Sequence, residues 1–216
     1  MDQVLIDYLA RWGHYLFGIT WIGLLYYFNF VQTEYFKEAD GDARTDAFTK
    51  LVPRALWWFR WGAMFTFLTG LIMLGIRGAG VTLDITVGAV LGTLMFLNVW
   101  LIIWPNQKIV IASNEQVKSG GAALPEAAGA APKAGLASRT NTLFSIPMLF
   151  FMGSSAHYAH GGLNGNTTAL IAALVIIAAL ELNGIFGKQG PMTTVRGVIV
   201  SGLVLTAVLW GIVEIL

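Results

Sequence analysis

The sequence predicts an all-α protein that crosses a membrane about six times as one bundle, because three observations agree. Hydrophobic residues make up 56% of the 216 residues and charged residues only 12%, against roughly 25% charged in an ordinary soluble domain. Several apolar segments have a length close to the about 20 residues that a helix needs to cross a bilayer core. Lysine and arginine are divided very unevenly between the connecting segments. We therefore expect a polytopic membrane protein with a single domain over residues 1–216.

The apolar segments are predicted to be helices, because a backbone in lipid has no water to bond and must satisfy its own polar groups. Their approximate ranges are 8–31, 56–76, 85–104, 142–158, 168–186 and 195–216. Between the third and the fourth lies SGGAALPEAAGAAPKAGLAS, which is rich in glycine, alanine and proline. That composition predicts a flexible linker over about residues 112–138.

The charge distribution predicts the orientation. Eleven of the 13 lysines and arginines lie on the side that carries the long segments 32–55 and 105–138. Positive residues favour the cytoplasmic side, so both termini are expected outside, in the periplasm if the source is a Gram-negative bacterium. We expect a multi-pass protein of the inner (cytoplasmic) membrane, in contact with the lipid bilayer. A net charge of +1 gives no argument for nucleic acid as a partner.

The chain has three histidines and no cysteine, and the predicted topology places all three histidines near the outer face. His14 lies about six residues, or about 9 Å, into the first helix, and His157 and His160 lie at the outer end of the fourth. Neutral imidazole binds haem iron, copper and zinc. Two of these histidines could hold a haem b, and three could hold copper or zinc. The alternative is a set of hydrogen-bonded interfacial histidines without a cofactor.

Other polar residues have less specific interpretations, and no catalytic residue can be assigned. Trp21, in the middle of the first helix, either packs in the core or forms a wall of the histidine site. Four residues near the outer helix ends are expected to be solvated charges: Asp7, Arg11, Asp84 and Glu214. A second polar cluster at the inner side is expected to be a structural network or an anion or quinone-headgroup site. It contains Arg54, Arg60, Asn98, Asn106, Gln107, Lys108, Arg139, Asn141, Glu181 and Asn183.

Four stretches of the chain are similar to the N-terminal membrane domain of the bacterial membrane-bound urate oxidase (urate hydroxylase) family. They are RWGHYLFGITWIGLLYYFNFVQ, PRALWWFRWGAMFT, LNVWLIIWPNQK and ASRTNTLFSIPMLFFMGSSAH, and the similarity weakens over the last two helices. The resemblance implies an oxidoreductase or one of its subunits. Full-length members carry a c-type cytochrome after this domain, on the outside. A chain without cysteine cannot attach a c-type haem, so we expect a short form that passes electrons to a separate periplasmic c-type cytochrome.

A looser resemblance concerns the first helix, where His14 is followed by the Trp-x-Gly motif at Trp21. It is similar to the first helix of membrane protoporphyrinogen oxidases, in which this histidine is a haem ligand, and of copper-resistance membrane proteins. The resemblance implies that His14 is the proximal ligand of a haem b and His157 the opposite one. The expected function is thus electron transfer by a membrane redox subunit. The alternative is a cofactor-free accessory or structural subunit that packs against other subunits of a larger respiratory or photosynthetic membrane complex.

Overall fold

The structure is a computed structural model that describes residues 2–163 and 165–216. Within these residues the chain folds into helices and forms no strand longer than an isolated bridge between Thr82 and Gly162, as the all-α prediction requires. The α-helices are α1 (Gln3–Tyr26), α2 (Thr33–Glu38), α3 (Gly41–Arg77), α4 (Leu83–Leu97), α5 (Trp104–Lys118), α6 (Ala127–His157), α7 (Thr167–Phe186) and α8 (Val195–Ile215). Short π- or 3₁₀-helical segments join them: η1 (Tyr27–Gln32), η2 (Gly78–Gly80), η3 (Asn98–Ile103) and η4 (Gly190–Thr193).

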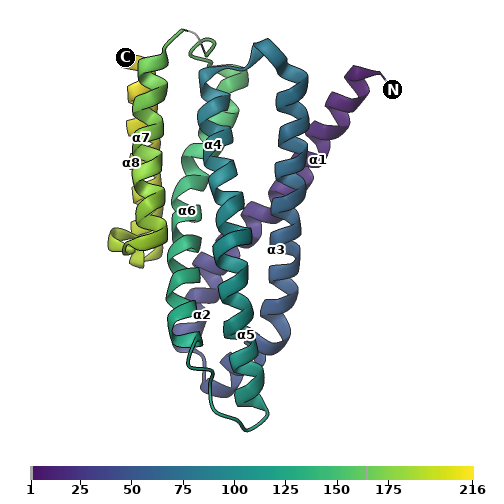
Figure 1. Ribbon diagram of the computed structural model, residues 1–216, viewed down its shortest axis with the longest axis vertical. Helices are drawn as coiled ribbons and strands as arrows, with labels where there is room; N and C mark the ends of the chain where they lie inside the picture. The colour runs from purple at the N-terminus through teal and green to yellow at the C-terminus, as the bar shows by residue number, and fades with distance from the viewer. Residues whose placement is uncertain (1, 164) are drawn as a thin grey trace.

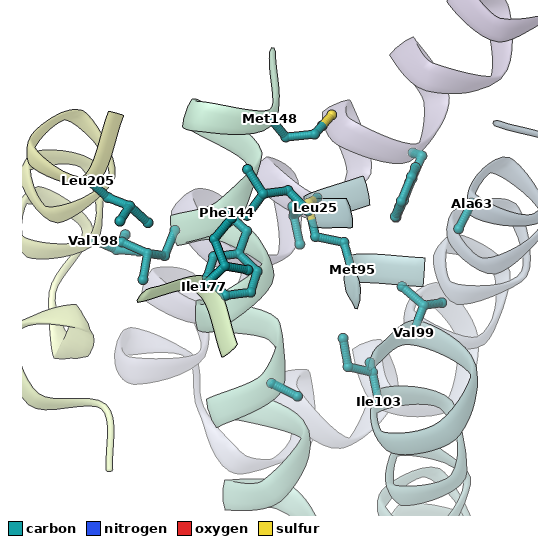
Figure 2. Close-up of a cluster of buried hydrophobic side chains, with 14 of the residues drawn as sticks. Leu25, Ala63, Met95, Val99, Ile103, Phe144, Met148, Ile177, Val198 and Leu205 are labelled. Atoms are coloured by element: carbon teal, nitrogen blue, oxygen red, sulfur yellow. The ribbon is translucent and has the colours of Figure 1, made fainter. Parts of the chain in front are cut away.

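Helix α6 lies in the middle of the bundle. It packs against α4, α5, α7 and α8, and it contacts α1 near the C-terminal end of α1, at Tyr26. Helices α7 and α8 form one edge of the molecule and α3 the other, while α1 crosses diagonally behind (Figure 1). Buried apolar side chains from all of these helices meet around α6, as Figure 2 shows for Leu25, Met95, Phe144 and Ile177, each at most 1% exposed.

Two of the long helical rods are longer than a bilayer needs. Helix α3 has 37 residues, which is about 55 Å at 1.5 Å per residue, and α4, η3 and α5 form one run over Leu83–Lys118. The hydrocarbon core is only about 30 Å thick. Both rods therefore extend beyond it, and their more polar halves lie together at the end of the molecule away from the termini (Figure 1).

Four helical runs are long and apolar enough to cross a membrane: Gly41–Gly80, Leu83–Lys118, Thr167–Phe186 and Val195–Ile215. Helices α1 and α6 do not reach that hydropathy, so six crossings remain a prediction. For α6 the reason is its position, because other helices enclose polar residues such as Arg139 and Asn141. Both termini lie at the same end of the bundle (Figure 1), which agrees with termini on one side of the membrane; that this side is periplasmic remains a prediction.

The predicted flexible linker over 112–138 is wrong. Helix α5 continues to Lys118 and α6 begins at Ala127, so only residues 119–126 lie between helices. Alanine is the best helix former, and Ala130, Ala134 and Ala137 form a buried face of α6 where small side chains let other helices approach. The segment 32–55 is also mostly helical, whereas the last two predicted helices agree with α7 and α8 to within one residue.

Candidate functional site

The structure does not bring the three histidines together. His14 lies between α1 and α3, with Nδ1 3.2 Å from Thr69 Oγ1. His157 is the last residue of α6, is exposed, and lines a shallow groove with Trp210 of α8. Helix α8 lies at the opposite edge of the bundle from α3 (Figure 1). His160 lies in the loop after α6 rather than on the helix. These positions do not fit a haem held between His14 and His157.

A metal site shared by these histidines does not fit either. Among the described residues, no group of three histidine, cysteine or acidic side chains is arranged to hold a metal ion. Trp21 is 2% exposed and packs in the interface with α3. There a Cβ at Gly62 would lie 3.2 Å from the Trp21 backbone nitrogen. Trp21 is thus part of the core, and haem b, copper or zinc as a cofactor of this chain remains a prediction.

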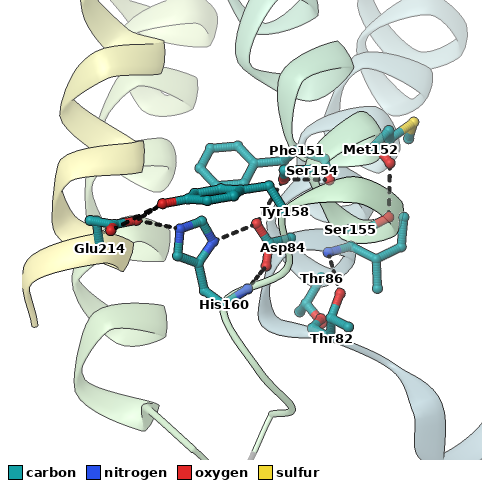
Figure 3. Close-up of polar contacts among 11 residues, drawn as sticks. Thr82, Asp84, Thr86, Phe151, Met152, Ser154, Ser155, Tyr158, His160 and Glu214 are labelled. Carbon is teal, nitrogen blue, oxygen red and sulfur yellow. Dashed lines mark hydrogen bonds and ion pairs between the residues drawn. The ribbon is translucent and has the colours of Figure 1, made fainter.

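His160 instead joins two carboxylates at the end of the bundle that carries the termini (Figure 3). Its Nδ1 lies 2.8 Å from Asp84 Oδ1, its Nε2 lies 2.8 Å from Glu214 Oε2, and its backbone N–H donates to Asp84 Oδ2 at 2.8 Å. Ser154 Oγ donates to Asp84 at 2.7 Å, and the Tyr158 hydroxyl donates to Glu214. We call these five residues the His160 cluster; they connect α4, α6, the following loop and α8.

The His160 cluster is a structural contact between helices rather than an open ligand site, because both ring nitrogens of His160 already form hydrogen bonds to carboxylates. Asp84 is completely buried, so the expectation of a solvated helix-end charge is wrong for this residue. Burial alone would lower the pKa of His160, but the hydrogen bonds and charges of Asp84 and Glu214 outweigh it and raise that pKa. A protonated His160 can donate to both carboxylates at once, which a neutral ring cannot.

The opposite end of the bundle contains a partly open cavity of about 290 Å³ with both polar and apolar walls. It lies between η1, α3, α5, α6 and the segment around η4, and we call it the Arg139 pocket. Its walls include the aromatic rings of Phe28 and Phe59 and the polar side chains of Gln32, Gln107, Ser138 and Arg139. Arg139 and Gln107 belong to the inner polar cluster that the sequence predicts, whereas Gln32 does not.

Three buried polar atoms in the walls of the Arg139 pocket have no hydrogen-bond partner among the described residues. They are Arg139 Nη1, Gln32 Oε1 and Gln107 Oε1. Arg139 is 4% exposed, and its nearest counter-ion is Glu34, whose Oε1 lies 4.0 Å from Nη2. A buried polar group without a partner costs about 1–3 kcal/mol, and more if it is charged. Three of them around one cavity indicate a place where a polar ligand binds.

Two π-helical segments contribute to these walls. Phe28, Asn29 and Gln32 lie on η1, and Ile103 ends η3. A π segment adds a residue to a helical turn and is frequent at functional sites. Asn29 holds η1 against α6, because its Nδ2 donates to Ser138 Oγ at 2.8 Å and to Leu25 O at 2.9 Å. The sequence signal for this site is the pair Asn29 and Gln32 within an otherwise apolar helix.

The rest of the predicted inner cluster divides into separate contacts. Asn98 Nδ2 donates to Asn141 Oδ1 at 2.9 Å and to Glu181 Oε2 at 3.1 Å. Arg60 lies over the ring of Trp104, with Cζ 3.9 Å from the ring centroid. The network of Asn98, Asn141 and Glu181 is buried and lies next to the Arg139 pocket along two helical segments, since η3 and α6 contribute to both.

Comparison with known protein families gives one match. The family described as Urate oxidase N-terminal matches residues 77–213, which is more than half of the chain. The match includes α7 and α8 up to residue 213, where the resemblance was expected to be weaker, and the stretches LNVWLIIWPNQK and ASRTNTLFSIPMLFFMGSSAH. The other two stretches, RWGHYLFGITWIGLLYYFNFVQ and PRALWWFRWGAMFT, lie outside it. Searches of curated proteins and of solved structures found no match. The chain therefore belongs to the Urate oxidase N-terminal family.

Proposed function

We propose that this chain is the membrane domain of a urate-oxidase-type redox assembly and that the Arg139 pocket binds its substrate, a flat anionic ring of the urate type. The observation that carries the proposal is the convergence of three buried, unpartnered polar atoms on one cavity. The family match supports the class of substrate.

The chemistry of the walls suits such a ligand. A guanidinium group presents a planar fork of N–H donors that matches a delocalised anion, and Arg139 Nη1 has no protein partner to lose. The glutamine amides at Gln32 and Gln107 can each accept from ring N–H groups or donate to ring oxygens. Phe28 and Phe59, whose ring centroids lie 5.4 Å apart, supply apolar surface for a flat ring.

The size and charge of the pocket restrict the ligand further. A volume of about 290 Å³ lies at the small end of ligand pockets, which run from about 300 to 1,000 Å³. It suits one small heterocycle rather than a lipid or a large cofactor. With a neutral quinone headgroup, the charge of Arg139 would be compensated only by the half-exposed Glu34 at 4.0 Å, so an anion is favoured.

Oxidation of such a ring releases electrons, which need an acceptor. We propose that the acceptor is a c-type cytochrome at the end of the bundle that carries both termini; the 216 residues contain no cysteine, so none of them attaches a c-type haem. Arg139 and His157 are 18 residues apart on α6, about 27 Å of rise, so electrons would have to cross most of the membrane. No step is assigned to a haem between the histidines, since their positions do not fit one.

Equilibrium binding to the purified chain tests the proposal. Isothermal titration calorimetry with urate should show saturable binding by the wild type. Binding should be about 10- to 100-fold weaker in Arg139→Gln, because one charge-assisted hydrogen bond is lost. The matched control is Arg11→Gln, in an exposed pair with Asp7 at the far end of α1, which should bind as the wild type does.

The same titration separates the alternative functions. A cofactor-free accessory subunit would bind no urate, and a quinone site would bind a soluble ubiquinone analogue in preference to urate. Equal affinity of the wild type and Arg139→Gln for urate would show that the Arg139 pocket is not the site.

A further inference from the structure

Glu181 is a buried acid that the proposed binding site does not use. It lies on α7 and is 8% exposed. Its Oε2 accepts one hydrogen bond, from Asn98 Nδ2 at 3.1 Å, and Oε1 accepts none from the described residues. Asn98 and Asn141, its neighbours in the network, are 2% and 0% exposed. This carboxyl group therefore lies largely buried between helices, with a single donor among the described residues.

Asn98 has no further donor to offer this carboxyl group. Asn98 uses its two amide hydrogens for Asn141 and Glu181, and Asn141 Nδ2 donates to Met95 O at 2.9 Å. In the described part of the chain, Glu181 forms no ion pair within 4.0 Å. The titratable and charged residues on the helices that pack against α7 are Asp84 on α4, Lys133, Arg139 and His157 on α6, and Arg196 and Glu214 on α8.

A carboxylate in such surroundings is costly. Enclosing an ionised carboxyl in an apolar medium without a cationic partner is far less favourable than enclosing the neutral acid, and one amide N–H compensates only a small part of that cost. The neutral acid also gains an O–H donor, which the ionised form lacks. The surroundings of Glu181 thus favour a bound proton.

The network shares two helical segments, η3 and α6, with the Arg139 pocket. Asn141 is two residues from Arg139 on α6, about 3 Å further along the axis, and η3 begins at Asn98 and ends at Ile103, a wall of the pocket. The positive charge of Arg139 opposes the proton on Glu181 when the pocket is empty. An anion in the pocket cancels that charge and so favours the proton.

We propose that Glu181 is a proton-binding site inside the bundle. An anion bound in the Arg139 pocket increases the affinity of the Glu181 carboxyl group for its proton. The first half concerns the chain alone. The second half rests on the proposed function, because it requires an anion in the pocket. Anion binding then raises the pH at which Glu181 loses its proton, and by linkage a protonated Glu181 favours the bound anion.

Infrared spectroscopy of the full chain tests the first half without any ligand. The wild type at neutral pH should show the C=O stretch of a protonated carboxyl group. The band should be missing in Glu181→Gln, an isostere that can still accept from Asn98. It should persist in Glu115→Gln, which changes an exposed acid on α5. A wild-type spectrum without this band, or a band that survives in Glu181→Gln, would overturn the proton site.

A pH titration of the same infrared band, recorded with and without urate, tests the coupling. The pH midpoint at which the Glu181 band disappears should move to higher pH in the presence of saturating urate, and the shift should be lost in Arg139→Gln. Bound urate with an unchanged midpoint would overturn the coupling while the binding site stands. A chain that shows the Glu181 band but binds no urate would overturn the proposed function and the coupling, and would leave the proton site supported.

Discussion

Replacing His160 with alanine removes two side-chain hydrogen bonds that connect α4 to α8 through the loop after α6. The lost contacts are Nδ1 to Asp84 Oδ1 and Nε2 to Glu214 Oε2, both 2.8 Å. The backbone N–H of residue 160 can still donate to Asp84, as can Ser154. The buried carboxylate of Asp84 therefore keeps two donors but loses its charged one.

The two contacts differ in strength because they differ in exposure. Asp84 is completely buried, and a hydrogen bond between charged partners there contributes about 1.5–3 kcal/mol. Glu214 has a side chain that is 41% exposed, so solvent screening limits its ion pair to about 0–1 kcal/mol. His160→Ala should thus lower the free energy of unfolding by about 2–4 kcal/mol.

The loss should depend on pH. The folded-state pKa of His160 is raised above its ordinary 6.5 by Asp84 and Glu214, which outweigh its burial. Its contribution to stability is therefore fully present below about pH 6.5 and is lost as pH rises through the raised pKa. The difference in stability between the wild type and His160→Ala should shrink over that range.

Unfolding in mixed detergent micelles, followed by circular dichroism at several pH values, measures both effects. The matched control is His157→Ala, which changes an exposed histidine only three residues away and should alter stability by less than about 0.5 kcal/mol. Equal stability of the wild type and His160→Ala at acidic pH would show that His160 does not stabilise the fold through Asp84 and Glu214. A difference in stability that grows toward alkaline pH would contradict the same claim.

Two other predictions concern the packing and extent of α6. Gly184→Ala should destabilise the bundle by about 1–3 kcal/mol, because the new Cβ would lie 2.7 Å from Thr140 Oγ1. The control Gly211→Ala places its Cβ in open space and should be neutral or stabilising. Equal effects of the two substitutions on the free energy of unfolding would contradict the close α6–α7 contact. Limited trypsin digestion should cut after Lys118, beside the non-helical residues 119–126, and spare Lys133 inside α6; equally rapid cleavage at both would support the flexible linker instead.

The helices could be predicted from the sequence wherever apolar content alone decides. The ranges of α7 and α8 follow directly from their hydropathy, since both lie at the edge of the bundle and are largely exposed. Helix α6 was predicted only in part, from residue 142. Its first turns are built from small residues such as Ala130 and Ala134, whose burial depends on which helices meet them, and composition alone cannot show that.

The polar sites were harder to predict because they depend on partners far away in the sequence. The position of Arg139 pointed to an inner anion site, but Gln32 joins it only because η1 packs beside α6. Asp84 and Glu214 read as helix-end charges, since nothing local shows that His160 lies between them. The three histidines share a predicted depth in the membrane, yet depth does not fix their place around the bundle. His14 on α1 faces α3, whereas His157 lies beside α8.

An experimental structure of the chain with bound urate would show whether a flat anion occupies the Arg139 pocket. We expect the ring within the cavity walled by Phe28 and Phe59, with ring atoms within hydrogen-bond distance of Arg139 Nη1 and of at least one of Gln32 and Gln107. Urate bound near His14 or in the groove beside His157, with the Arg139 pocket empty, would contradict this expectation.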